Sequence, residues 1–273
     1  MTNLYRLVLQ KILRISKRLR EDSRVVRLTQ NWRGLLSAKI FKSELGEIRL
    51  RNGVVLTAPP QTDLGFLFQE IWIDKTYNPK DYRIAPGDVI VDIGANIGVF
   101  SLYAATAAPR TEVYAFEPFP DNIRYLRQNI AASHIKNIRI EEKAVARNAQ
   151  PRRLEITESG ITHKLREKEN SAEGFLVECT TLDEILDKME KCDLLKIDCE
   201  GSEYEIIYSC RPENLKKIHR IVGEYHDRDE ASQNGTALKE FLETKSFRTD
   251  YFTAFNDRVG LICATRTDWN TET

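Results

Sequence analysis

The sequence lacks any excess of charge, since its 41 basic residues are balanced by 41 acidic residues. The composition as a whole therefore gives no electrostatic preference for polyanions such as nucleic acids. It also lacks an uninterrupted apolar run of the roughly 18 residues that indicates a membrane-spanning helix. We accordingly expect neither a nucleic-acid partner nor a membrane span.

Cysteine is sparse, and its spacing shows no CxxC pair. An odd number of cysteines cannot all form disulfide bonds within one chain, and three of the five lie within apolar runs. We expect reduced thiols in a cytoplasmic protein rather than a metal site or a disulfide framework. The five are Cys179, Cys192, Cys199, Cys210 and Cys263.

The first 20 residues lack the features of a secretory signal, because basic residues such as Arg14 and Lys17 interrupt any apolar segment. Apolar residues from Leu4 to Leu19 recur at helical spacing, with basic residues between them. This pattern predicts an amphipathic helix that packs on the main domain or forms a homodimer. The alternative is peripheral contact with an anionic membrane surface.

Short β-type runs follow this helix. "AKIF", "GEIRL" and "GVVLTA" each predict a strand, and the Asn52-Gly53 pair predicts a hairpin turn. We expect residues 1–80 to form an N-terminal helix and β-hairpin cap, and residues 81–273 to form the main domain. Trp72 is expected to pack between the two.

From residue 89 onward, short aliphatic strands alternate with helical stretches. This alternation predicts an α/β fold, a mostly parallel sheet with helices on both faces. Ligands of such sheets bind outside the carboxyl ends of the strands, near the point where the strand order reverses. The predicted strand ends carry Asp92, Glu117, Asp198, Glu200, Glu224 and His226.

The stretch "DIGANIG", residues 92–98, places two glycines between a strand and a helix, which is typical of a cofactor-binding turn. The GxGxxG pattern of dinucleotide-binding proteins is absent, because its middle glycine is missing. Asp92 would repel a pyrophosphate but suits a ligand with an ammonium and a sulfonium, such as S-adenosylmethionine. Glu117 is placed to accept hydrogen bonds from the ribose hydroxyls of such a ligand.

Several of these motifs together resemble the FkbM family of S-adenosylmethionine-dependent methyltransferases. They are "VIVDIGANIGVFSLYAA", "VYAFEPFPDNIRYLRQNI", "EKAVA", "TTLDEIL" and "LLKIDCEGSEYEII". The resemblance covers about residues 70–227, and Cys199 replaces the valine of the family's "IDVEG". It implies the Rossmann-like class I methyltransferase fold, seven-stranded with an antiparallel last strand. It also implies methyl transfer to a hydroxyl oxygen, often of a sugar, a glycan or a secondary metabolite.

Under this resemblance, one set of residues is expected to bind the cofactor. It comprises the glycine turn, the ends of the neighbouring strands and the "EKAVA" segment. Its members are Asp92, Gly94, Ala95, Asn96, Gly98, Glu117, Pro118, Ala144 and Asp198.

A hydroxyl acceptor must lose its proton, which calls for a general base. Residues alternate sides along a strand, so Asp198 and Glu200 share one face and Glu224 and His226 share another. His226 is the natural base because histidine titrates near neutrality, although a carboxylate could serve and His226 could be a packed core residue. The carboxylates could orient acceptor hydroxyls or hold a divalent cation such as Mg²⁺, but the spacing does not favour a metal.

Other functions stay open on the sequence alone. The fold could serve as a non-catalytic binding module, or methylate a nitrogen or a nucleic acid, whereas a nicotinamide-dependent oxidoreductase is disfavoured by the glycine spacing. The polar insertion at residues 151–177 is either a solvated hairpin or a flap over the site. Tyr77 either closes over the ligands or packs in the core.

Overall fold

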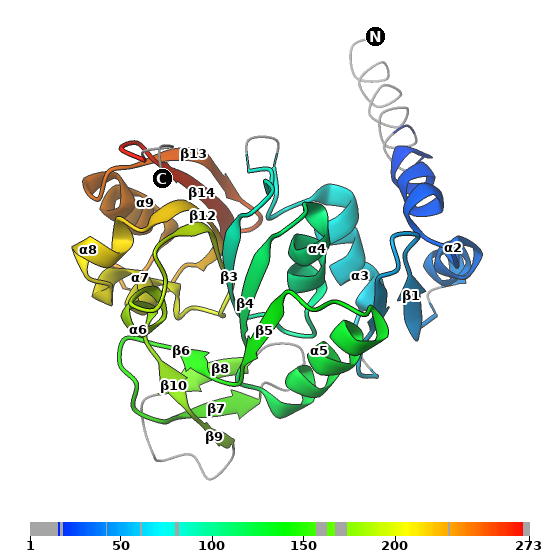
Figure 1. The fold of residues 1–273 in the computed structure, drawn as a ribbon, viewed down its shortest axis with the longest axis horizontal. Helices are drawn as coiled ribbons and strands as arrows, with labels where there is room; N and C mark the ends of the chain where they lie inside the picture. The colour runs from blue at the N-terminus through cyan, green and yellow to red at the C-terminus, as the bar shows by residue number, and fades with distance from the viewer. Residues whose placement is uncertain are drawn as a thin grey trace.

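The computed structural model shows one mixed β-sheet flanked by helices, with the N-terminal elements at one side (Figure 1). The structure describes residues 16, 19–41, 43–60, 62–79, 82–156, 163–166, 174–228 and 230–269.

Seven strands form the main sheet, in the order β13-β14-β12-β11-β3-β4-β5. The run from β12 to β5 is parallel, whereas β14 lies antiparallel between β12 and β13. This is the class I methyltransferase fold, as expected. The strands are β3 (Val89–Ile93), β4 (Glu112–Phe116), β5 (Ile138–Glu141), β11 (Cys192–Ile197), β12 (Ile218–His226), β13 (Phe247–Ala254) and β14 (Val259–Arg266).

The strand order reverses beside β3. After β3 the chain adds β4 and β5 on one side, and it then returns to add β11 on the other side. The connections that follow β3 and β11 lead to helices on opposite faces of the sheet, and ligands of such sheets bind at the carboxyl ends of these strands.

Each central strand is buried on both faces, because successive side chains point to opposite sides. Ile90 and Leu194 belong to one core cluster, while Val91 and Leu195 belong to the other. The first face is covered by α3 (Leu64–Phe68), α4 (Val99–Ala107) and α5 (Pro120–Ala132). The second is covered by α6 (Leu182–Leu186), α7 (Glu203–Ser209), α8 (Pro212–Leu215) and α9 (Gly235–Thr244).

The N-terminal cap comprises helical residues 19–28, α2 (Trp32–Phe41) and the hairpin β1 (Glu47–Arg49) and β2 (Val55–Thr57). The prediction that "AKIF" forms a strand is wrong, since these residues end α2. Leu35 and Ala38 are three residues apart, so they lie on the same side of a helix and are both buried. Ile40 and Phe41 at the end of "AKIF" are exposed. The hairpin prediction is confirmed. The predicted amphipathic pattern before residue 19 lies almost wholly outside the described residues.

The cap shares a core with the main domain. Ile48 and Leu56 of the hairpin belong to the same buried cluster as Leu102 of α4. Asn129 of α5 is buried, and its side chain accepts a hydrogen bond from Thr57 N and donates to Thr57 O at 2.8 and 3.0 Å. A π-helix, η1 (Gln69–Asp74), continues from α3 toward β3.

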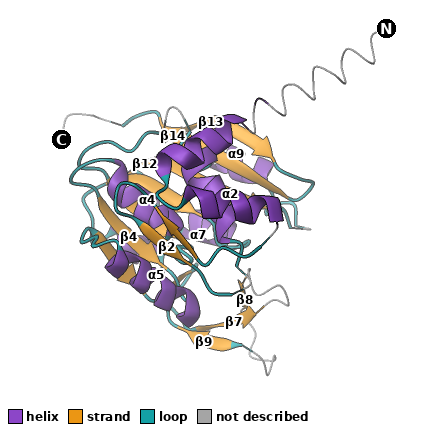
Figure 2. Cartoon of the chain, turned by 90° about the vertical axis from the view of Figure 1, so that its right-hand side faces the viewer, coloured by secondary structure: helices purple, strands orange, loops and turns teal. Residues whose placement is uncertain are grey.

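The insertion at residues 151–177 forms a small sheet of its own, β8-β7-β9, at the lower end of the molecule (Figure 2). Its strands are β7 (Arg152–Ile156), β8 (His163–Arg166) and β9 (Phe175–Val177). A short parallel pair, β6 (Ala144–Val145) and β10 (Cys179–Thr180), brings its two ends together. Within the described ranges, we find no helix with the length and apolar character needed to cross a bilayer.

Candidate active site

A cavity lies at the carboxyl ends of β3, β4 and β11, at the predicted position. Its wall includes the β6 segment and Leu154 of β7, so the small sheet forms one side of it. Of the residues expected to bind the cofactor, six line the cavity: Gly94, Asn96, Glu117, Pro118, Ala144 and Asp198.

Gly94 permits the close approach of the two loops that meet at this cavity. Its φ is +78°, and a Cβ atom there would lie 1.8 Å from the carbonyl oxygen of Asp198. A side chain would therefore push the β3 and β11 loops apart, and the left-handed φ would add strain. Asn96 also has a left-handed φ of 52°, which asparagine tolerates better than most residues.

Glu117 is a nearly buried carboxylate on the cavity wall. It accepts hydrogen bonds from Asn96 N at 2.8 Å, Phe119 N at 2.9 Å and Asn122 Nδ2 at 3.3 Å. Burial raises its pKa above the ordinary value, against the effect of these donors. A carboxylate offers about four acceptor positions, so Glu117 retains capacity for a ligand hydroxyl. This free acceptor position fits a hydroxyl of the ribose of S-adenosylmethionine.

Asp92 does not line the cavity, and its contact with the cofactor stays a prediction. The residue is 0% exposed, its Oδ1 lies 3.1 Å from Lys196 Nζ, and its Oδ2 accepts a hydrogen bond from Ser101 in α4. Lys196 neutralises the charge that we expected to meet the cofactor's ammonium. Ala95 and Gly98 do not line the cavity either; a Cβ at Gly98 would lie 2.3 Å from Leu126 Cδ1, so this glycine serves helix packing.

Three carboxyl groups and a phenol meet beside the cavity. The hydroxyl of Tyr77 lies 3.1 Å from Asp198 Oδ2 and 2.9 Å from Glu224 Oε1. A phenol has one proton, so both contacts are full hydrogen bonds only when a carboxyl carries a proton. Burial, together with the charge of Asp198, raises the pKa of Glu224 to about 8 and that of Glu70 to about 7. The cluster therefore holds protons at neutral pH.

His226 lies beside this cluster, at the end of β12, and its ring is held by Glu203. The Nδ1 atom lies 3.0 Å from Glu203 Oε1, and Glu203 is 1% exposed and also accepts from the backbone N of Gly201 at 3.0 Å. Because Glu203 is a carboxylate, Nδ1 is the donor of this pair. Burial disfavours the imidazolium, but the Glu203 hydrogen bond and the neighbouring negative charges raise the pKa of His226 to about 9.

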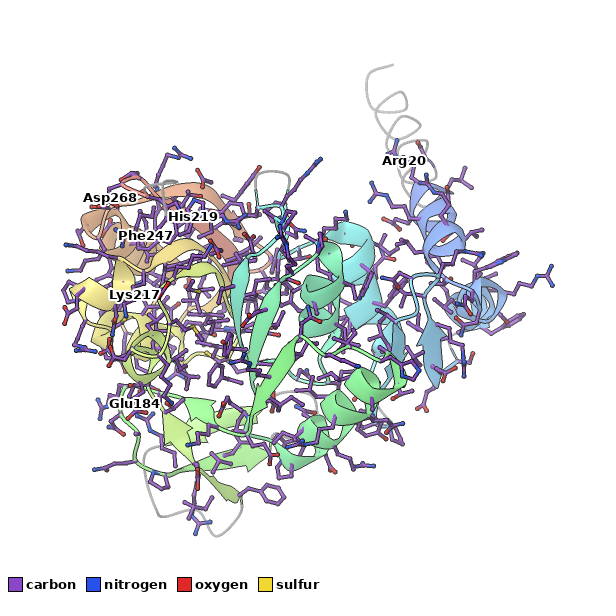
Figure 3. The ribbon with its side chains drawn as sticks, in the orientation of Figure 1. Arg20, Glu184, Lys217, His219, Phe247 and Asp268 are labelled. Atoms are coloured by element: carbon purple, nitrogen blue, oxygen red, sulfur yellow. The ribbon has the colours of Figure 1, made fainter. Side chains whose placement is uncertain are left out.

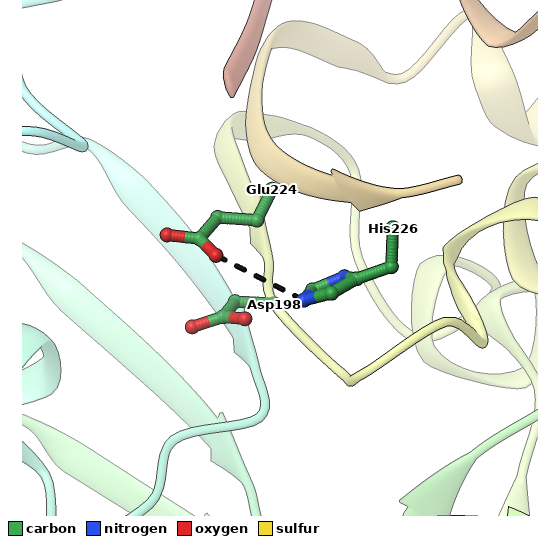
Figure 4. A group of neighbouring side chains, drawn as sticks. All are labelled: Asp198, Glu224 and His226. Carbon is green, nitrogen blue, oxygen red and sulfur yellow. Dashed lines mark ion pairs between the residues drawn. The ribbon is translucent and has the colours of Figure 1, made fainter. Parts of the chain in front are cut away.

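The other ring nitrogen of His226 faces the carboxylates (Figure 4). Its Nε2 lies 3.6 Å from Glu200 Oε2 and 3.9 Å from Glu224 Oε2. One ligand atom each from Asp198, Glu224 and His226 lie within 4.8 Å of one another, a set that could also hold a divalent cation. The geometry thus permits either proton transfer at Nε2 or metal binding.

The structure brings the four predicted catalytic residues together, but Glu200 reaches the site from a turn and not from a strand. Glu224 and His226 share a face of β12 as expected. Glu200 follows β11 in a turn with φ 56°, so strand alternation does not place it. Sequence reasoning assigned no role to Glu70 and placed Glu203 only as following the turn at Gly201. It offered Lys196 only as an ion-pair partner of Asp198 and Glu200, a contact that the structure shows for Asp198 at 3.8 Å.

Comparisons with known proteins show the family to which the chain is similar. The family model described as "Methyltransferase FkbM domain" matches residues 92–252. A 31-O-demethyl-FK506 methyltransferase from Streptomyces tacrolimicus is 28% identical over 223 residues, covering 70% of this chain and 85% of the relative. A hexuronic acid methyltransferase from Haloferax volcanii is 28% identical over 144 residues, covering 51% of this chain and 56% of the relative.

Solved structures align with the chain at low identity and low TM-score. A SAM-dependent methyltransferase from Aquifex aeolicus aligns with a TM-score of 0.41 at 13% identity, covering 72% of this chain and 92% of that one. At this score the fold assignment rests on the strand order of the chain itself.

Proposed function

Because the chain belongs to the FkbM family of S-adenosylmethionine-dependent methyltransferases, we propose that it methylates a hydroxyl oxygen of a sugar, a glycan or a secondary metabolite. Two relatives support this acceptor class, since their names specify an O-demethyl acceptor and a hexuronic acid. The observation that carries the proposal is the Glu203–His226 pair, which presents a ring nitrogen beside the cofactor cavity.

Gly94, Asn96, Glu117 and Ala144 would hold the cofactor in the cavity. Bound S-adenosylmethionine supplies a methyl group on a sulfonium, which is a good leaving group. The Glu117 carboxylate would accept from the ribose hydroxyls, while the backbone at Gly94 allows the cofactor to approach the turn between β3 and α4.

The catalytic residues then act on the acceptor hydroxyl. His226 Nε2 accepts the hydroxyl proton, so that the oxygen can attack while Nδ1–H remains hydrogen-bonded to Glu203. Glu200, Glu224 and Asp198 would accept hydrogen bonds from further acceptor hydroxyls, as suits a polyhydroxylated molecule. His226 must be neutral to serve as a base, and the positive charge of the cofactor would lower its pKa toward neutrality.

The location and assembly remain proposals as well. All five cysteines are free thiols, which supports a reducing compartment such as the cytoplasm. A homodimer or a membrane contact through the N-terminal helix is a further prediction.

The first test is binding of S-adenosylmethionine, measured by calorimetry. We expect binding by the unmodified chain, at least tenfold weakening by Glu117→Ala, and no binding of NAD. The matched control is Glu112→Ala, at the exposed opposite end of the same strand. Absence of S-adenosylmethionine binding, or equal effects of the two substitutions, would contradict the cofactor site.

The second stage identifies the acceptor atom. Carbon-13 methyl-labelled cofactor is incubated with a panel of sugars and hydroxylated metabolites, and the methyl resonance distinguishes an O-methyl from an N-methyl product. We expect O-methyl products, and we expect turnover to survive treatment with EDTA. Loss of turnover that Mg²⁺ restores would show instead that Asp198, Glu224 and His226 hold a metal.

A further inference from the structure

A second cavity lies between the N-terminal cap and the main domain, away from the cofactor cavity. It has a volume of about 940 Å³, within the range of roughly 300–1,000 Å³ for small-molecule sites. Its rim carries Arg24 and Arg27 of the first helix, Lys75 after η1 and Arg83 before β3. We call this cavity the basic groove.

The charge of the basic groove differs from that of the whole chain. The molecule has equal numbers of basic and acidic residues, but the groove is lined by four cationic side chains and a single acidic one, Asp74. Within the described part of the chain, none of the four cations forms an ion pair with a carboxylate. Exposed arginines elsewhere do so, as Arg124 does with Asp121 and Arg211 with Asp187. Like charges around one cavity repel unless an anion lies between them.

The helix that supplies the two arginines is docked on the core. Val25 is 5% exposed and belongs to the core cluster, and Arg24 Nη1 donates a hydrogen bond to Ile73 O of η1 at 2.9 Å. Arg24 and Arg27 are three residues apart and therefore lie on neighbouring positions of one helix face. In Figure 3 this helix leads away from the main body toward the labelled Arg20. The arginines are thus held at the groove by a fixed element.

The groove has an aromatic floor with unsatisfied polar atoms. Trp72 is 6% exposed and packs edge-on against Tyr103, with ring centroids 5.1 Å apart. Trp72 Nε1 and Asn78 Oδ1 are buried and have no hydrogen-bond partner among the described residues. Buried polar atoms without partners are costly, so the residues of this floor carry an unsatisfied donor and an unsatisfied acceptor.

From these observations we propose that the basic groove binds a phosphate-bearing ligand whose phosphate is attached to an apolar or aromatic group. The cations of Arg24, Arg27, Lys75 and Arg83 suit a phosphate, since guanidinium groups bind its oxygens in pairs. The aromatic floor covers the attached group. The source is either a soluble organic phosphate or the headgroup of an anionic lipid, and both present the same chemistry.

The test measures binding to the full chain by two probes. Phenyl phosphate is titrated while tryptophan fluorescence is recorded, and vesicles of phosphatidylcholine with and without phosphatidylglycerol are tested by flotation. We expect binding to phenyl phosphate, to the anionic vesicles, or to both, and at least tenfold weakening in the double variant Arg24→Gln/Arg27→Gln. The first result alone identifies a soluble phosphate, and the second alone identifies a lipid.

The matched control is Arg124→Gln/Arg127→Gln, which removes two exposed arginines from α5. Trp72→Phe adds a second readout, because it should abolish the fluorescence change without abolishing binding. The proposal is overturned if neither probe binds, or if both double variants weaken binding equally. Because no methyl acceptor is involved, its failure is distinguishable from failure of the proposed function.

Discussion

Lys196 is a buried cation that joins two strands beneath the candidate active site. It is 3% exposed, donates to Gly94 O at 2.8 Å, and lies 3.1 Å from Asp92 Oδ1 and 3.8 Å from Asp198 Oδ2. Burial works against its charge, but the two aspartates outweigh this and raise its pKa. Its role is to fix the glycine turn relative to β11.

Lys196→Met should therefore destabilise the fold strongly. It leaves Asp92 as an unpaired carboxylate at a fully buried position, which costs about 3–5 kcal/mol. The measurement is the free energy of unfolding in urea. The double variant Lys196→Met/Asp92→Asn should recover much of the loss, since neither charge remains. A single-variant cost below about 1 kcal/mol would show that the pair contributes little.

The Glu203–His226 pair predicts an alkaline pH profile. Since the pKa of His226 is about 9, kcat/KM should rise with pH, levelling off near pH 9 or lower once the cofactor is bound. Glu203→Gln removes the negative charge that favours the imidazolium form of His226. In this variant kcat/KM should therefore level off at a lower pH, and its plateau value should be lower. Glu213→Gln, on the exposed surface of α8, should leave both unchanged. An unaltered profile in Glu203→Gln would rule out this pairing.

For single residues, the sequence predicted which side chains lie at the strand ends better than it predicted which groups they contact. Glu117 lies at the cavity as expected, because the strand ends follow directly from the alternating pattern. Asp92 does not line it, because its partner Lys196 is distant in sequence and reaches it only across the sheet. Long-range ion pairs of this kind leave no local signal.

Among the elements, α5 connects the cap to the cofactor turn. Asn129 binds both backbone groups of Thr57 in β2, and its Nδ2 also donates to Ile97 O at 2.9 Å. Ile97 lies within the glycine turn. A single buried amide thus ties the hairpin to the loop that lines the cofactor cavity.

Asn129→Ala should cost about 2–3 kcal/mol, because it leaves backbone groups of Thr57 and Ile97 without partners. It should also weaken cofactor binding, since the turn loses a support. Thermal unfolding followed by circular dichroism, with and without S-adenosylmethionine, measures both. Asn148→Ala, at an exposed position, is the control, and equal melting temperatures in the two variants would contradict the role of Asn129.

Element types could be read from the sequence wherever the period was clear. The seven main strands and the helices between them follow from alternation of aliphatic and helical stretches. The π-helix η1 could not be predicted, because its form depends on tertiary contacts. The carbonyl oxygen of Glu70 accepts a hydrogen bond from the backbone N of Thr76 beyond the end of the helix, and the side chain of Ile71 packs in the core. Apolar residues of the types that form strands elsewhere in the chain form the end of helix α2 in the stretch "AKIF".

For the whole molecule, the carboxylate cluster makes stability depend on pH. Glu224 and His226 both have pKa values raised in the folded state, to about 8 and about 9. At these two groups the folded state binds protons more tightly than the unfolded chain, so their contribution to stability is greatest below the ordinary pKa of each. It should fall as the pH rises from the ordinary value of each group through its raised value, most steeply between about pH 6.5 and 8.

Glu224→Gln should stabilise the protein at pH 8, because glutamine needs no proton to remain neutral. We expect about 1–3 kcal/mol, seen as a higher melting temperature at pH 8 with little difference at pH 5. Glu213→Gln serves as the control. A variant that melts lower than the unmodified chain at both pH values would contradict the raised pKa.

The division into a cap and a main domain remains a proposal, and the shared core suggests that the two unfold together. Cap residues such as Leu56 pack on the same cluster as Leu102. The sequence indicated where the β-hairpin lies, but not that Asn129 and the core join it to the main domain.

The position of β14 has a consequence for synthesis of the protein. This strand follows all its neighbours in the chain, yet it lies between β12 and β13. A nascent chain still attached to the ribosome, with β14 not yet released, would leave the backbone edge of β12, from Arg220 to His226, open to chaperones or to other chains. The end of β12 that carries Glu224 and His226 thus takes its final form only after β14 has been translated, which ties the candidate site to completion of the sheet.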